Sequence, residues 1–82
     1  MMSVGSLARL QRNVTVSVAT YAGNGFVEKG EARFVDECNV LVCGAPDDGF
    51  VVCLCFASGS PIAFVQTEDL APLIGEYEWD LV

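Results

Sequence analysis

Short apolar segments rich in β-branched residues, separated by clusters of turn-forming residues, constrain this chain more than any other feature. In the clearest example, Val14, Val16 and Val18 alternate with smaller or polar residues. A period of two places successive side chains on opposite faces of a β-strand. The expected strands cover 14–21, 26–35, 39–43, 50–57, 62–66 and 76–81. Strands spaced about ten residues apart, with turns between them, predict an all-β, mainly antiparallel domain.

The length of 82 residues limits this sheet to a single compact domain that spans the whole chain, 1–82. We expect a small five- to six-stranded barrel or two-layer sheet, preceded by a short helix at 3–11. One helical turn is expected at 67–70, before the last strand, because Thr67 is a favourable N-cap and acidic residues follow it. This order of elements is loosely similar to SH3-like and Sm-like barrels. The resemblance concerns topology alone and assigns no binding residue.

The first two strands are expected to form a hairpin, because the segment between them is rich in glycine and asparagine. An even-numbered register sets Ala32 and Phe34 beside Val14 and Val16. Gly30, in the middle of the returning strand, indicates a bulge or bend. This hairpin is therefore the one place where the sequence predicts an interruption of regular pairing.

The four cysteines form no zinc-binding pattern with the usual pair spacing. If Cys43 lies opposite Phe50 in a hairpin, then Cys38 faces Cys55 on the neighbouring strand. We expect buried, reduced thiols that act as small apolar side chains. A disulfide between Cys38 and Cys55 and a metal site remain the alternatives, and thiol titration under native and denaturing conditions separates them.

Charge and residue content exclude several functions. The net charge is −7 and the chain contains no histidine. A direct binder of nucleic-acid phosphates needs a basic surface, and Ser-His or Cys-His catalysis needs the imidazole. The N-terminal ten residues lack the pattern of a secretory signal, and the sequence has no apolar run long enough to span a membrane. We therefore expect a cytoplasmic, non-enzymatic protein without cofactor or metal.

Charge is distributed unevenly along the chain. Residues 1–33 contain all four bases and two acids, whereas residues 34–82 contain nine acids and no base. On the expected last strand, Glu76, Glu78 and Asp80 share one face, at about 7 Å intervals. The other acids that we expect at a partner-binding surface are Glu68, Asp69, Asp47, Asp48, Asp36 and Glu37. Their adjacent carboxylates and the Asp47-Asp48-Gly49 loop offer only weak alternatives as an acid–base pair or a calcium site.

These features predict a protein-binding inhibitor whose acidic C-terminal half occupies the basic nucleic-acid-binding cleft of a target. Carboxylates pair with the same arginine and lysine side chains that hold phosphate. In size, charge and lack of catalytic groups, the chain resembles small acidic inhibitors encoded by phages, including anti-CRISPR, anti-restriction and glycosylase-inhibitor proteins. The resemblance implies a protein partner, with no direct contact to nucleic acid or membrane.

Two other functions stay open at this point. Apolar residues make up 52% of the chain, which is more than one small core needs. An apolar face is therefore expected to dock in a larger assembly or in a homodimer. A small ligand in the mouth of the barrel is the remaining alternative.

Overall fold

The computed structural model describes residues 3–73, which form one antiparallel sheet of seven strands with a short 3-10 helix. The elements are β1 (Leu7–Leu10), β2 (Val14–Tyr21), β3 (Phe26–Val35), β4 (Cys38–Val42), β5 (Phe50–Cys55), β6 (Ile62–Gln66), η1 (Thr67–Asp69) and β7 (Leu70–Pro72). Their order across the sheet is β3-β2-β6-β5-β4-β1-β7. The expected antiparallel β fold, with a helical turn before a last strand, is confirmed within these residues.

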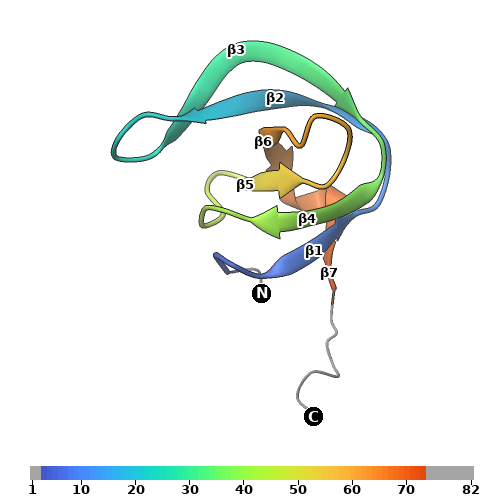
Figure 1. The fold of residues 1–82 in the computed structure, drawn as a ribbon. Helices are drawn as coiled ribbons and strands as arrows, with labels where there is room; N and C mark the ends of the chain where they lie inside the picture. Colours follow the sequence, from blue (N-terminus) through green and yellow to red (C-terminus); the bar gives the residue numbers. More distant parts are fainter. Residues whose placement is uncertain (1–2, 74–82) are drawn as a thin grey trace.

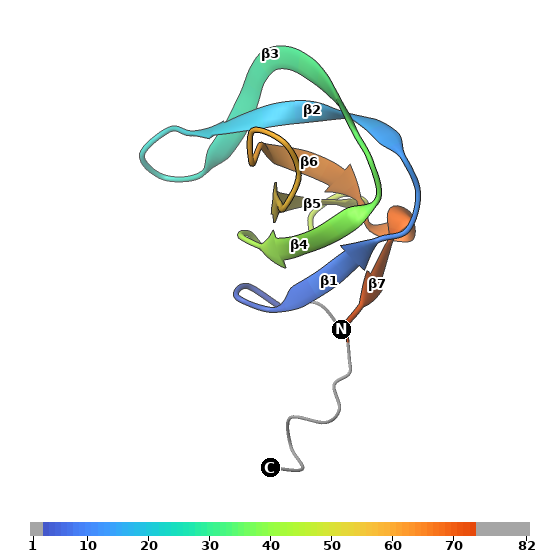
Figure 2. The same cartoon turned by 45° about the vertical axis from the view of Figure 1, so that its right-hand side comes forward.

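The sheet curls around a single core. In Figures 1 and 2 the β2–β3 hairpin arches over β6, β5 and β4, and β1 and β7 lie on the opposite side. The core is made mostly of β-branched and small side chains, which pack well against a pleated surface. Its largest fully buried members are Leu10, Val40, Val42, Val51, Val65, Cys53 and Cys55. The hydrophobic effect of this burial holds the strands in one curved layer.

The N-terminal segment differs from the prediction. The expected helix at 3–11 is wrong, because residues Leu7–Leu10 form β1 between β4 and β7. Ala8 and Leu10 are fully buried and alternate with the exposed Leu7 and the partly exposed Arg9. Pairing on both sides of β1 satisfies its backbone groups and outweighs the weak helical pattern of so short a segment. With β1 and β7, the described sheet has seven strands rather than five or six.

The β2–β3 hairpin confirms the bulge but not the register. Beside the turn Tyr21 pairs with Phe26, and beyond the bulge Val14 pairs with Val35, which overturns the even-numbered register. The register shifts between Ser17 and Ala19, opposite the part of β3 that contains Gly30. Gly30 has φ +87°, a left-handed conformation that other residues rarely adopt. The bulge bends β3 and contributes to the arch of the hairpin.

The C-terminal part of the described chain runs from β6 through η1 into β7. The helical turn lies at Thr67–Asp69, as expected, and β7 follows it directly and pairs with β1. The strand predicted at 76–81 lies outside the described residues. Within 3–73, no helix has the length and apolar character needed to cross a bilayer.

Candidate functional site

An opening lies between two neighbouring strands of the sheet. β2 and β6 pair only where Ser17 meets Phe64 and Val18 meets Ala63. From 14 to 16, β2 pairs with β3 alone, and the C-terminal end of β6 pairs with β5 alone. The two strands therefore separate over this stretch, and we call the opening the β2–β6 slot.

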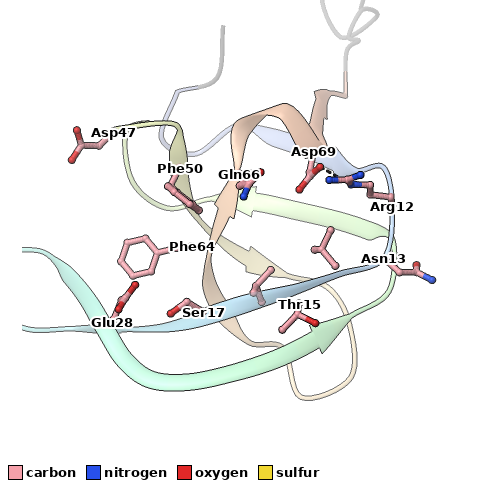
Figure 3. Close-up of a pocket in the computed structure, with 12 residues that line it drawn as sticks. Arg12, Asn13, Thr15, Ser17, Glu28, Asp47, Phe50, Phe64, Gln66 and Asp69 are labelled. Carbon is pink, nitrogen blue, oxygen red and sulfur yellow. Dashed lines mark ion pairs between the residues drawn. The ribbon is translucent and has the colours of Figure 1, made fainter.

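The β2–β6 slot is a cavity of about 610 Å³. Its lining residues are Arg12, Asn13, Val14, Thr15, Val16, Ser17, Glu28, Asp47, Phe50, Phe64, Gln66 and Asp69. Its apolar lining comes from β2, β5 and β6, and its charged groups lie toward two opposite ends, Glu28 and Asp47 at one and Arg12 and Asp69 at the other (Figure 3). An apolar floor with a few polar groups is typical of protein sites that bind another molecule.

One end of the slot is closed by a partly buried ion pair. Arg12 Nε lies 2.7 Å from Asp69 Oδ1, and the Asp69 side chain is only 7% exposed. The Gln11 N–H also donates a 2.9 Å hydrogen bond to the Asp69 carbonyl oxygen. These contacts rejoin the start of β2 to the end of β6. The carboxylate of Asp69, a residue expected at a partner-binding surface, pairs with Arg12 of the same chain.

The opposite end of the slot carries Glu28 and Asp47. Figure 3 shows both carboxylates at this end, with the Phe64 ring nearby and Asp47 directed away from the middle. Glu28 pairs with Ala19, which is buried, so the Glu28 side chain projects from the same face of the hairpin. Sequence reasoning missed Glu28, although the position of the turn at 22–25 already fixes this pairing.

Two further acidic residues, Asp48 and Glu68, directly follow or precede residues that line the slot. Asp48 follows Asp47 in the β4–β5 loop, with φ 55°. Glu68 shares shallow hollows with Arg12 and Asp69 on one side and with Phe50 on the other.

A third acidic segment meets the closed end of the slot. Asp36 and Glu37 form the turn between β3 and β4, and the Glu37 N–H donates a 2.9 Å hydrogen bond to Asn13 Oδ1. Since Asn13 lines the slot, this turn lies at its Arg12 end. Glu76, Glu78 and Asp80, the first residues predicted for a binding surface, lie outside the described residues.

The described acids outnumber their basic partners. Between residues 3 and 73 the structure contains two ion pairs, Arg12 with Asp69 and Lys29 with Glu31 at 3.9 Å. Arg12 is the only base that lines the slot, and its charge is offset by Asp69. The rim of the slot therefore presents carboxylates to solvent without neutralising side chains.

Cys38, Cys53 and Cys55 lie in the core and Cys43 is partly buried, and none of the four lines the slot. The predicted register that set Cys38 opposite Cys55 is wrong by two residues, since Val40 pairs with Cys55 and Val42 with Cys53. The cause is a tighter turn than expected, closed by mutual hydrogen bonds between the backbones of Asp47 and Phe50.

All four thiols are free, as expected. Burial is the main cause that raises the pKa of Cys53 and of Cys55 to about 12, and the neighbouring thiols of Cys38 and Cys43 add to both shifts. Burial is also the main cause that raises the pKa of Cys38. The described part of the chain contains no cluster of three metal-ligating side chains. Cys38, Cys53 and Cys55 therefore serve as core side chains, since a protonated buried thiol is a poor nucleophile and ligand.

Large apolar side chains also reach the surface outside the slot. Tyr21 and Phe34 are each more than 60% exposed, and Phe56 is about half exposed. The Tyr21 ring packs edge-to-face against Phe26, with centroids 5.3 Å apart. These aromatic groups belong to different parts of the sheet, namely the hairpin and the end of β5.

Comparisons of the chain with known protein families, with curated proteins and with solved structures gave no match.

Proposed function

We propose that this chain is a non-enzymatic, protein-binding inhibitor whose acidic surface occupies the basic nucleic-acid-binding cleft of a target. The observation that supports it is the imbalance of charge around the β2–β6 slot. Glu28, Asp47 and Glu68 have no basic partner among the described residues, while the one base of the slot is held by Asp69. A basic cleft supplies the partners that these carboxylates lack.

The spacing of charges supports a surface built from several elements. Duplex DNA carries one negative charge about every 1.7 Å of its axis, counting both strands. Alternate residues of one strand stand about 7 Å apart, so a single strand of carboxylates is too sparse to replace a duplex. The acids of the β3–β4 turn, the β4–β5 loop, β3 and η1 surround one opening, which gives a denser arrangement.

Competition with DNA tests the proposal. The tagged chain is used to capture proteins from an extract of its source cells, and a 30-base-pair duplex is then added. We expect the captured protein to be released by the duplex and by 0.5 M NaCl, because both displace carboxylates from a basic cleft. We also expect the chain to inhibit the nucleic-acid binding of the captured protein. Capture that neither the duplex nor salt disturbs contradicts the proposal.

Variants locate the acids responsible. Replacement of Glu28 and Asp47 by Gln and Asn is expected to weaken capture about tenfold or more, because two unpaired carboxylates are removed. A triple change of Glu76, Glu78 and Asp80 to amides tests the C-terminal acids in the same way. Glu31→Gln is the matched control, since Glu31 already lies beside Lys29 on the same hairpin. Equal losses from the control and from the slot variant exclude a specific acidic surface.

A docking module for a larger assembly is the second candidate, and the exposed aromatic side chains favour it. Phe34, at 63% exposure, contributes little to the core, so Phe34→Ser is expected to leave the fold intact. Under this function the substitution abolishes capture, and binding does not weaken as salt rises. Salt-resistant capture that depends on Phe34 therefore selects the docking module over the inhibitor.

A further inference from the structure

The β2–β6 slot interrupts the hydrogen bonding of the sheet. Along a strand of an antiparallel sheet, the backbone N–H and C=O groups of alternate residues point toward one neighbouring strand and then toward the other. Along 14–16, β2 pairs with β3 only, so alternate residues direct N–H and C=O groups into the slot. Backbone groups without a protein partner need another partner, because leaving them unsatisfied is costly.

The slot is bounded along its length. The pairing of Ser17 with Phe64 marks one end, and the hydrogen bond from Gln11 to Asp69 marks the other. At about 3.3 Å per residue, the intervening stretch of chain, 12–16, matches an extended segment of about five residues. A segment in this position lies alongside β2 in the manner of an added strand.

The side chains around the slot define what such a segment must carry. Between its ends the slot is lined by apolar side chains of β2, β5 and β6, among them Val14, Val16 and Phe50. The carboxylates of Glu28 and Asp47 stand at one end, and the acidic turn Asp36-Glu37 is hydrogen-bonded through its backbone to Asn13 at the other. Apolar residues at the centre and basic residues at the ends complement this arrangement.

We propose that the β2–β6 slot binds an extended peptide segment of the partner protein, apolar at its centre and basic at its ends, as an added strand beside β2. The partner's basic character rests on the proposed function, whereas strand addition rests on the interrupted hydrogen bonding between β2 and β6. The outer edge of β3, which pairs with no other strand within residues 3–73, is less suited to strand addition, because the Gly30 bulge and the charges of Lys29 and Glu31 disrupt regular pairing there.

The test uses a synthetic peptide, acetyl-Lys-Lys-Val-Thr-Val-Lys-Lys-amide, titrated into the isotope-labelled chain and followed by NMR. We expect saturable shifts at 14–17 and Phe64, and at least tenfold slower hydrogen exchange at the β2 amides that face the slot. A peptide N-methylated at its three central residues keeps the charges and apolar groups but loses backbone donors. We expect it to bind at least tenfold more weakly.

Two variants distinguish binding of the peptide at the slot from non-specific electrostatic attraction to the acidic chain. Glu28→Gln is expected to lower the affinity for the peptide about threefold to tenfold, while the control Glu31→Gln leaves this affinity unchanged. Equal binding of the N-methylated peptide, protection of β3 instead of β2, or the absence of binding at millimolar peptide overturns the inference. The DNA-sensitive capture of a whole protein does not depend on this peptide, so failure of the slot and failure of the proposed function are distinguishable.

Discussion

The ion pair between Arg12 and Asp69 is expected to stabilise the fold as well as to close the β2–β6 slot. Arg12→Met keeps most of the side-chain stem but removes the charge. Exposed ion pairs contribute roughly 0.2–1 kcal/mol, and loss of one partner of a buried pair costs roughly 3–5 kcal/mol. Asp69 is 7% exposed and Arg12 is 65% exposed, so this pair is intermediate. We expect the free energy of unfolding to fall by about 2 kcal/mol.

A double-mutant cycle in urea measures this directly. Asp69→Asn is expected to cost less, about 1 kcal/mol, because Arg12 then stays solvated and no buried charge is left unpaired. The double variant should lie close to Asp69→Asn, which gives a coupling energy of about 2 kcal/mol. For a domain of this size, a loss of about 2 kcal/mol lowers Tm by about 8–16 °C. A cost below about 0.5 kcal/mol for Arg12→Met, with no coupling to Asp69, refutes the reasoning.

Two further predictions concern the bulge and the core. Gly30→Ala is expected to destabilise the fold by about 1–2 kcal/mol in urea titration, because Gly30 has φ +87°, whereas Gly25→Ala, without a positive φ, is the control and should cost less. Similar costs for both contradict a role for the bulge. At pH 8 a thiol reagent should modify Cys43 first, since Cys53 and Cys55 are buried and keep their protons. The pKa of Cys53 and of Cys55 is about 12 in the folded state and 9.0 ordinarily. Their contribution to the free energy of unfolding is therefore complete below pH 9 and is lost as the pH rises to 12, because the unfolded chain releases these protons first. Alkaline urea titrations check this, and replacement of both by Val should reduce the loss.

The alternation in β2 and the apolar runs of β5 and β6 were sufficient to predict these strands, because each of them buries side chains in the core. β3 was predicted as the returning strand of the first hairpin, although only Val35 of this strand is buried. The turn of the first hairpin and its bulge followed from glycine alone. β1 was predicted as helix, since nothing local in a short segment such as Leu7–Leu10 reveals that two strands far away in sequence pair with it. Pairing partners are long-range information that local periodicity lacks.

The candidate site was predicted less completely than the fold. Sequence reasoning named Asp47 and Asp69 but treated both as free surface charges. Only the structure shows that Asp69 is buried against Arg12, and that Glu28 from the base-rich N-terminal part of the chain joins Asp47 at the same opening. Which charges meet depends on how the hairpin arches over β6, and that geometry depends on the bulge and on the whole sheet.

By itself, the sequence determined a small, acidic, antiparallel β domain with a reduced, cysteine-containing core. These properties follow from composition and from a period of two, both of which are local. The tertiary structure decided the register of each hairpin, the place of β1, and the separation of β2 from β6. It decided them because strand pairing and charge neutralisation are set by contacts between distant residues, whose free energies depend on burial in the folded chain.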